Sequence, residues 1–390
     1  MRDTITHYLA NLCKRLAALA CTALLAACSD GGDNPPSGVS VANLNILHGF
    51  DCDPPRPADG DQCRVAERVA LLVDFLIARD CPDIVALQEI VNRIIVQRSP
   101  SESAGPLDSI VDLIEAELPR LAAACGFTYH VAYEPFLAQG VFETDEELVL
   151  SRYPVLSNTI NPVHSALYDI PNDLLIFARH VLHTRIAHPA GDVDVYSTHL
   201  SSGSDDATNP CNSISELIPG TGIGPRVACP AECNTADTVR ACQARQMALL
   251  VETTRGPGNL ALIMGDFNAV PETSEYLEMT SRGWLDTHLA AGAAECDAAT
   301  GQNCTSGRSS SAASLENPAL GVNRRIDYIF AALDDTTCRA GEVAGSYQLV
   351  EGGLFADRPN PFAATCGPPP AAMCWVSDHS GNYARLRCTP

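Results

Sequence analysis

The chain is organised around the stretch Asn259-Leu-Ala-Leu-Ile-Met-Gly-Asp-Phe-Asn-Ala-Val-Pro-Glu272. Its apolar run, residues 260–264, predicts a short buried strand that ends at Gly265. Asp266 and Asn268 follow, and the period of two along a strand places their side chains on the same side. Taken alone, a Gly-Asp-x-Asn segment is more typical of a polar turn that closes a core strand. Several other segments of matching chemistry favour a functional site.

Five further segments bring polar residues to the ends of apolar runs. They are Leu44-Asn-Ile-Leu-His-Gly49, Asp83-Ile-Val-Ala-Leu-Gln-Glu89, Ser197-Thr-His-Leu200, Arg325-Ile-Asp-Tyr-Ile329 and Ser377-Asp-His379. With Gly265-Asp-Phe-Asn268 they resemble, in family order, the motifs of the endonuclease/exonuclease/phosphatase superfamily, the DNase I-like proteins. The resemblance covers residues 39–388. It implies a four-layer α/β sandwich, in which two mixed β-sheets pack face to face between helices. The sequence pattern alone supports only an α/β protein with a large core.

Hydrophobic periodicity predicts the main elements of this domain. Helical spacing covers residues 64–78, 107–124 and 238–253. Strands are expected over residues 39–47, 84–87, 128–133, 147–152, 192–199, 326–331 and 382–387. Polar segments at 50–63, 201–234 and 290–322 are expected to be loops, and long loops on a rigid scaffold often select the substrate.

The first residues are predicted to be an export signal and not part of the fold. Lys14 and Arg15 precede an apolar run, residues 16–26, that is too short to span a bilayer stably. Leu25-Ala-Ala-Cys28 resembles a bacterial lipobox, which implies lipidation of Cys28; an ordinary secretory signal cut nearby is the alternative. We expect a lipoprotein signal peptide at 1–27, a flexible tether at 28–38 and the domain at 39–390. The protein would then be anchored to a membrane in the periplasm or at the cell surface.

Cysteine usage agrees with export. Three of the 17 Cys lie at positions 13, 21 and 28, and the remainder are even in number, which suggests disulfides. Close sequence neighbours are the expected pairs: Cys52 with Cys63, Cys296 with Cys304, and Cys374 with Cys388. Cys211, Cys229, Cys233 and Cys242 are expected to pair among themselves, with a four-Cys zinc site as the alternative.

The charge of the chain argues against a processive nuclease. It has 47 acidic and 25 basic residues, a formal net charge of −22, and no Lys follows Lys14. A nucleic-acid binder usually carries a basic surface. The substrate class nevertheless stays open among nucleic acid, a phospholipid and a phosphorylated small molecule, because charge at the site and divalent cations also matter. No feature of the sequence indicates a protein partner.

Hydrolysis of a phosphate ester requires neutralisation of the phosphoryl charge, deprotonation of water and stabilisation of the leaving oxygen. Carboxylate and amide oxygens suit Mg²⁺, with Mn²⁺ as the alternative. Glu89 is the first predicted metal ligand and Asn45 its nearest helper; a helix-start acid is the structural alternative for Glu89. The family resemblance makes Asp378 a third metal ligand or a site acid.

His379 is the predicted general base, because a histidine titrates near neutrality. The resemblance implies that Asp327 either holds His379 or contacts a second metal ion. It also implies that Asp266 orients the attacking water or binds metal, and that Asn268 donates to a phosphate oxygen. His199 would either donate to a phosphate oxygen as a cation or protonate the leaving group. The other histidines, His164, His183 and His188, are interpreted as structural.

The remaining candidates have weaker roles. Asp145, Glu146 and Glu147 are interpreted as a solvated turn, with the alternative that one of them orients His199. His48 is a weak candidate for the site. Arg152, Arg245 and Arg325 are expected to form structural or surface ion pairs rather than to clamp phosphate.

These patterns predict an exported, Mg²⁺-dependent phosphoesterase, and within that class they favour a phosphodiesterase. The alternative is a non-catalytic, surface-anchored binding lipoprotein on the same scaffold. That alternative predicts the loss of at least one essential acid or histidine, whereas all the matching positions are retained.

Overall fold

The computed structural model describes residues 38–47, 62–90, 109–135, 143–144, 146–164, 166–170, 173–202 and 230–390. The predicted signal peptide, Cys28, Cys52, His48 and Asp145 lie outside these ranges, as do residues 203–229. Gly38, expected to end the tether, is instead the first residue of strand β1. The predicted domain boundaries otherwise stay predictions.

Seven strands form the first sheet. Their order is β14 (Cys338–Ala340), β15 (Val343–Phe355), β16 (Gly381–Thr389), β1 (Gly38–Asn45), β2 (Ile84–Ile90), β5 (Glu146–Ser151) and β3 (His130–Ala132). β1 runs parallel to β2, and the other neighbouring pairs are antiparallel. The sheet is therefore mixed, as expected.

Six strands form the second sheet, in the order β12 (Leu285–Asp286), β13 (Asp327–Ala332), β11 (Leu260–Asp266), β10 (Val193–His199), β9 (His180–Ile186) and β6 (Val155–Pro162). Here β10 and β11 are parallel, and the remaining pairs are antiparallel. A small third sheet consists of β4 (Glu143–Thr144), β8 (Asp173–Ala178) and β7 (Ala166–Ile170).

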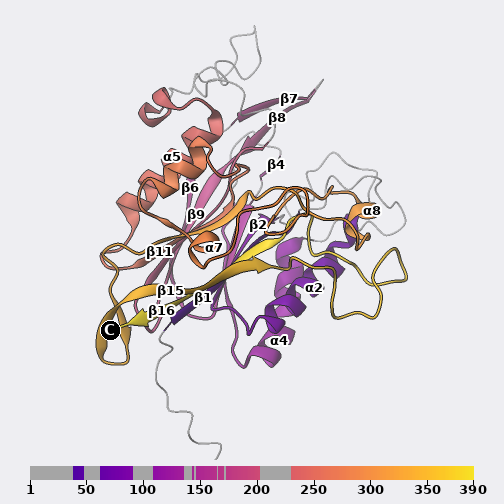
Figure 1. Cartoon of the computed structure of the whole chain (residues 1–390), viewed down its shortest axis with the longest axis horizontal. Helices are drawn as coiled ribbons and strands as arrows, with labels where there is room; N and C mark the ends of the chain where they lie inside the picture. Colours follow the sequence, from indigo (N-terminus) through magenta and orange to yellow (C-terminus); the bar gives the residue numbers. More distant parts are fainter. Residues whose placement is uncertain are drawn as a thin grey trace, which may run out of the picture. The chain divides into compact units, whose positions relative to one another are not determined.

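Helices cover the outer faces of the two large sheets (Figure 1). α2 (Val65–Ala78) and α4 (Ile110–Cys125) share one apolar cluster with the outer face of the first sheet. α5 (Val239–Thr254) and α6 (Ser274–Thr280) share another with the second sheet. A third cluster fills the space between the sheets. This arrangement confirms the predicted four-layer α/β sandwich. The shorter helices are η1 (Gln62–Arg64), η3 (Ala231–Thr235), α7 (Thr287–Ala290) and α8 (Ala312–Leu315).

Two of the long helices have side-chain caps, although α4 begins at Ile110 and not at the predicted residue 107. Ser109 caps α4 by accepting a bond from the backbone N–H of Asp112, and Gly126, at a φ of 76°, ends it. Thr238 caps α5 in the same way through Ala241. No helix in the described ranges combines the length and apolar character that a membrane crossing requires.

The functional end of the sandwich follows from the alternation of its strands. In β11, Leu260, Leu262 and Met264 face the core between the sheets, so the period of two turns Asp266 toward the same interior. Gly265 is required there: a Cβ atom would lie 1.9 Å from the Thr198 carbonyl oxygen of β10, and its φ is 151°. The neighbouring strands therefore approach closely where the polar residues begin.

The disulfides correct part of the predicted pairing. Cys296–Cys304 is confirmed, but Cys374–Cys388 is wrong, because Cys388 bonds to Cys338 and Cys374 to Cys366. Extended strand β16 separates Cys374 from Cys388, since each strand residue adds about 3.3 Å. A strand that was not predicted, β14, brings Cys338 close to the end of β16 instead.

Two further disulfides complete the pattern among the described residues. Cys81–Cys125 joins the residues that follow α2 to the end of α4, and it was not predicted. Cys233 pairs with Cys242, so these two thiols are not available to the alternative four-Cys zinc site. Cys63 is also disulfide-bonded. This number of disulfides is typical of an oxidising, exported environment.

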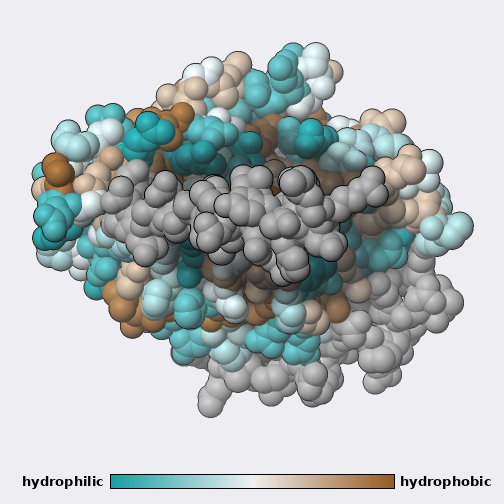
Figure 2. Space-filling view, turned by 90° about the horizontal axis from the view of Figure 1, so that it is seen from below, coloured by the Kyte–Doolittle hydropathy of each residue, from teal (hydrophilic) through white to brown (hydrophobic). Residues whose placement is uncertain are grey.

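Several strands were missed because their periodicity is weak. β15 is thirteen residues long but contains three glycines, and most of its side chains are at least partly exposed. β6 is mostly exposed as well. On the face in Figure 2, hydrophilic and hydrophobic residues are interspersed. Large exposed apolar side chains such as Leu156 of β6, Leu277 of α6 and Phe362, between β15 and β16, come from separate parts of the chain.

Candidate active site

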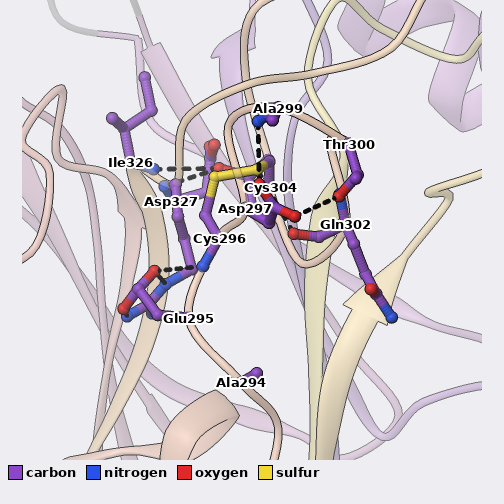
Figure 3. Close-up of a disulfide and its surroundings, with 12 residues drawn as sticks. Ala294, Glu295, Cys296, Asp297, Ala299, Thr300, Gln302, Cys304, Ile326 and Asp327 are labelled. Carbon is purple, nitrogen blue, oxygen red and sulfur yellow. Dashed lines mark hydrogen bonds and ion pairs between the residues drawn. A yellow bond between two sulfur atoms is a disulfide. The ribbon is translucent and has the colours of Figure 1, made fainter.

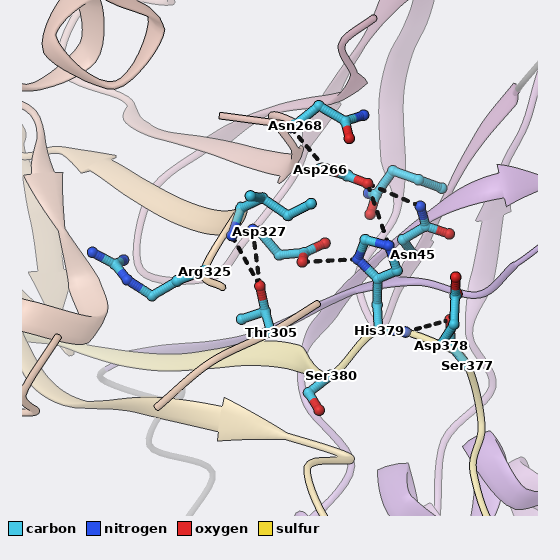
Figure 4. A network of polar contacts seen from close by, with 12 residues as sticks. Asn45, Asp266, Asn268, Thr305, Arg325, Asp327, Ser377, Asp378, His379 and Ser380 are labelled. Atoms are coloured by element: carbon cyan, nitrogen blue, oxygen red, sulfur yellow. Dashed lines mark hydrogen bonds and ion pairs between the residues drawn. The ribbon is translucent and has the colours of Figure 1, made fainter. Parts of the chain in front are cut away.

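The polar residues of five predicted motifs meet where the inner faces of the two sheets end. Asp266 of β11 lies beside Asp327 of β13 and beside His199 of β10 in the strand register. Asn45 ends β1 on the opposite sheet, and His379 precedes β16. Figure 4 shows Asp266 and Asp327 both directed at the His379 ring. Residues that are far apart in the sequence thus form one buried cluster.

His379 and Asp327 form the centre of this cluster. Nδ1 of His379 lies 2.9 Å from Oδ2 of Asp327, as the family resemblance implied for a holding acid. Burial raises the pKa of Asp327, and the negative charge of Asp266 raises it further. The positive charge of His379 lowers it but does not cancel the increase. Burial alone would lower the pKa of His379, but Asp327, Asp266 and Asp378 hold it well above its usual value.

Asp266 connects this pair to the rest of the site. Its Oδ1 accepts a bond from the backbone N–H of Asn268 at 2.8 Å, and its Oδ2 accepts from the Asn45 amide at 3.1 Å. The same Oδ2 lies 3.4 Å from Nε2 of His199 and 3.7 Å from Nε2 of His379. Burial opposes ionisation, but the two histidines and the two donors prevail and lower the pKa of Asp266.

Asn268 and His199 occupy the second-sheet side of the site. The amide nitrogen of Asn268 donates to the Leu200 carbonyl at 2.9 Å and lies 3.0 Å from Nε2 of His199. Asn268 has a φ of 50°, a left-handed conformation that Asn tolerates better than most residues. The turn after Asp266 therefore presents Asn268 next to His199.

Asn45 and Glu89 occupy the first-sheet side. The Asn45 amide nitrogen donates to Glu89 Oε1 at 2.7 Å, and its oxygen accepts from the Leu47 backbone N–H at 3.0 Å. The pairing of β2 with β5 is irregular between Leu87 and Ile90, and Glu89 has a φ of 61°. This break in the strand period brings Glu89 beside Asn45. Glu89 and Asn45 are therefore hydrogen-bonded neighbours, and their role as metal ligands stays a prediction.

A divalent cation fits the carboxylates of this site. Ligand atoms of Asp266, Asp327 and His379 lie within 4.8 Å of one another. Asp327 Oδ1 is buried and has no hydrogen-bond partner among the described residues, which is costly unless an ion or water completes it. Glu89 and Asp378, the predicted ligands, lie outside this group of three. Asp378 accepts a bond from the hydroxyl of Ser377 at 3.1 Å.

The weaker candidates have separate roles. Glu147 forms a buried pair with His180, and Glu146 accepts a bond from the Tyr133 hydroxyl. Among the described residues, the carboxylates within 4 Å of His199 are Asp266, at 3.4 Å, and Glu89, at 3.9 Å. The hypothesis that an acid at 145–147 orients His199 stays untested, because Asp145 lies outside the described residues.

The arginines form ion pairs, as predicted. Arg325 is buried between Asp286, at 2.7 Å, and Glu295, at 2.5 Å. Arg152 lies 3.3 Å from Asp83, and Arg245 lies 3.6 Å from Glu278.

Sequence reasoning missed the residues that support the site. Thr305 and Arg308 contact the backbone around Asp327 and His379, yet both lie in the 290–322 segment, whose sequence predicts only a long loop. Their only signal in the sequence was their position just after Cys304, one of the expected disulfide partners.

Solved structures of similar fold span nearly the whole chain. Truncated TDP2 from Caenorhabditis elegans matches with a TM-score of 0.50 at 16% identity, over 91% of this chain and all of that one. A family protein from Leptotrichia buccalis matches with a TM-score of 0.51 at 14% identity, over 89% and 99%. D. rerio TDP2, complexed with a single-strand DNA product, matches with a TM-score of 0.50 at 15% identity, over 90% and 99%. No match was found among curated protein sequences.

A family model completes the assignment. It matches residues 42–379, from the first strand to the predicted general base, and so spans all six motifs. Membership supports a hydrolase that acts on phosphate esters. The chain belongs to the Endonuclease/Exonuclease/phosphatase family.

Proposed function

We propose that the chain is an exported, metal-dependent phosphoesterase that hydrolyses a phosphodiester by in-line attack of water. The observation that carries the proposal is the buried group of Asp266, Asp327 and His379. Two carboxylates share one histidine there, and one carboxylate oxygen lacks a hydrogen-bond partner within the described part of the chain. An unpaired buried acceptor costs stability unless an ion or a water molecule completes it.

His379 is the proposed general base. Its Nδ1 is bonded to Asp327, so the neutral ring directs Nε2 toward Asp266, where a water molecule would lose its proton. Asp327 holds the ring in this orientation and stabilises the positive charge that develops on it. Asp266 would orient the attacking water.

His199 and Asn268 are the proposed contacts to the phosphoryl group. Both reach the site from adjacent strand ends, and each carries an N–H donor suited to a phosphate oxygen. His199 is the proposed acid for the leaving group.

Glu89, Asn45 and Asp378 remain the proposed metal ligands, and Asp266 and Asp327 add carboxylate oxygens that suit Mg²⁺. When bound, the cation would neutralise phosphoryl charge and oppose protonation of His379. Mn²⁺ is the alternative ion. The residues themselves orient the water, the ring and the phosphate.

We also propose that Cys28 is lipidated and anchors the enzyme to a membrane. The lipobox-like sequence and the disulfides support export. Mass spectrometry of the membrane fraction tests this proposal. A lipid-modified Cys28 peptide is expected, and Cys28→Ser should release soluble protein; an unmodified N-terminus at another residue would contradict it.

The activity is tested with the domain from residue 38, with its disulfides intact. Plasmid DNA, RNA, sphingomyelin and bis-(p-nitrophenyl) phosphate are the substrates, each with Mg²⁺ and with EDTA. We expect hydrolysis of at least one substrate, lost with EDTA and in His379→Ala. Failure of every substrate with folded protein and either Mg²⁺ or Mn²⁺ would favour the non-catalytic binding lipoprotein.

A further inference from the structure

A disulfide-closed turn lies directly against the candidate active site. Cys296 and Cys304 bond across a sequence separation of 8. Asp297 organises the turn: its Oδ1 accepts from the Ala299 N–H at 2.9 Å and its Oδ2 from the Thr300 hydroxyl at 2.8 Å. Figure 3 shows the disulfide beside Ile326 and Asp327. The disulfide that closes the turn thus lies next to Asp327, the residue proposed to hold His379.

Thr305, the residue after this disulfide, bonds to the backbone of Asp327 and to that of Ser380, the residue after His379. Its hydroxyl oxygen accepts bonds from the backbone N–H groups of Ile326, at 3.0 Å, and Asp327, at 3.2 Å. Its carbonyl accepts from the N–H of Ser380 at 2.6 Å. Thr305 is fully buried. One residue therefore joins the start of β13 to the loop that carries His379 (Figure 4).

Arg308 supports the same loop from the other side. Its Nη2 donates to the His379 carbonyl at 2.7 Å and lies 3.1 Å from the Ser380 hydroxyl oxygen. The guanidinium lies over the Trp375 ring, 4.0 Å from its centroid, and is 6% exposed. Burial lowers the pKa of Arg308 to about 10, although the charges of Asp378, Asp357 and Asp327 oppose the shift. Arg308 is therefore still a cation at neutral pH.

We propose that Thr305 and Arg308 are positioning residues for the hydrolysis, and that the Cys296–Cys304 disulfide holds them in place. This inference rests on the proposed function. The hydrogen bond between Asp327 and His379 joins segments 52 residues apart, so its geometry depends on what fixes both backbones. Thr305 fixes both, and Arg308 fixes the second. Neither residue touches the substrate in this scheme.

The first test compares Thr305→Val with Thr305→Ser. Val keeps the shape but leaves two buried N–H groups without an acceptor, whereas Ser keeps the oxygen. With bis-(p-nitrophenyl) phosphate and Mg²⁺, we expect Thr305→Val to lower kcat about 10- to 100-fold, as for other supporting residues, with KM nearly unchanged. Thr305→Ser should restore kcat to within about threefold of wild type. An equal loss in both variants, or a loss confined to KM, would overturn the role.

A double-mutant cycle separates positioning from general loosening of the fold. If Thr305 acts through Asp327, adding Thr305→Val to Asp327→Asn should cost little further kcat. Fully additive losses would contradict that route. Arg308 is tested in the same way, by comparing the kcat of Arg308→Met with that of the charge-retaining Arg308→Lys. Arg308→Met removes the donor to the His379 carbonyl and should lower kcat more.

A spectroscopic measurement keeps the inference testable without activity. The Nδ1 proton of His379, bonded to Asp327, should give a low-field resonance in ¹H NMR of the metal-free protein with ¹⁵N-labelled histidine. We expect Thr305→Val to shift or broaden it and Thr305→Ser to retain it. An unaltered resonance in Thr305→Val would refute the positioning role of Thr305. A wild-type protein that hydrolyses no substrate would refute the proposed function, and this resonance would still test the positioning role.

The disulfide is tested against a matched pair of cysteines. The double variant Cys296→Ser/Cys304→Ser should lower kcat at a temperature where it is fully folded. The control Cys338→Ser/Cys388→Ser opens a disulfide at the far end of β16 and should change kcat by less than about twofold. Loss of kcat in the control alone, or in neither variant, would remove the disulfide from the proposal.

Discussion

Two buried His–Asp pairs in this protein have nearly the same geometry and very different surroundings. His183 lies 2.8 Å from Asp194, and His379 lies 2.9 Å from Asp327. Asp194 also accepts bonds from Arg185, from the Gly256 N–H and from the Asn259 amide. Asp327 has one oxygen without a partner among the described residues. Distance alone therefore does not separate a structural pair from a candidate catalytic pair.

The charge around each carboxylate makes the distinction. Burial opposes ionisation of Asp194, but its donors prevail and hold its pKa well below the usual value. The pKa of Asp327 is raised, because burial and the neighbouring Asp266 outweigh His379. A carboxylate whose oxygens all accept hydrogen bonds stabilises the fold. A carboxylate with a free acceptor oxygen beside a second acid is suited to bind a cation or to take part in catalysis.

The largest expected difference between the pairs is in catalysis. His379→Ala should lower kcat/KM by about 10²- to 10⁴-fold, since general base catalysis contributes on that scale. His183→Ala should leave kcat/KM within about threefold, because its ring only stacks on Tyr196 and bonds Asp194. Steady-state kinetics of both variants decide. Comparable losses in folded protein would abolish the distinction.

The next difference is in stability, where we expect the larger effect at Asp194 and the smaller one at Asp327. Asp194→Asn should lower the free energy of unfolding by about 3 kcal/mol, because it breaks a buried charge network with Arg185. Asp327→Asn should change it by less than about 1 kcal/mol or raise it, since it relieves repulsion with Asp266. Urea unfolding of the metal-free variants measures both. A more stable Asp194→Asn would show that its network is not stabilising.

Metal binding should respond to one pair only. At free Mg²⁺ near 100 times its dissociation constant, the folded state should gain about 2.7 kcal/mol over protein kept in EDTA. Asp327→Asn should reduce that gain, and Asp194→Asn should preserve it. Thermal melting with increasing Mg²⁺ measures the response. A gain that persists unchanged in Asp327→Asn would place the ion on other residues.

The smallest effect is on acid stability. The folded pKa of Asp194 is below the unfolded value of about 3.9. Its contribution is therefore complete above that unfolded value and is lost as the pH falls through the lower folded pKa. Melting temperature of metal-free protein from pH 6 to pH 2 should fall less steeply for Asp194→Asn than for wild type. Identical slopes would contradict the lowered pKa.

Much of the site was predictable because it follows local rules. The apolar run before Asp266 and the motif around Asp327 belong to strands that the hydrophobic pattern revealed. The period of two then predicts on which side the terminal acids lie. The partners Asn45 and His379 were also identified, through resemblance to the family's motifs. Their roles remain proposals.

The sequence could not predict the supporting contacts. Thr305 has no periodic or motif signal, because its bonds to Asp327 and Ser380 depend on how a loop folds over two strand ends. Glu89 needed a backbone irregularity to reach Asn45. The pairing of Cys388 depended on β14 and β15, whose patterns are weak.

Periodicity and short motifs are encoded within a few residues, and they were enough to identify the family, the long helices and the strands that end in acids, amides and histidines. Packing of distant segments is what bonds Asp194 fully and leaves Asp327 Oδ1 without a hydrogen-bond partner among the described residues. That outcome depends on donors such as the Gly256 N–H and Asn259, which come from other segments, and on their positions once two sheets have packed together.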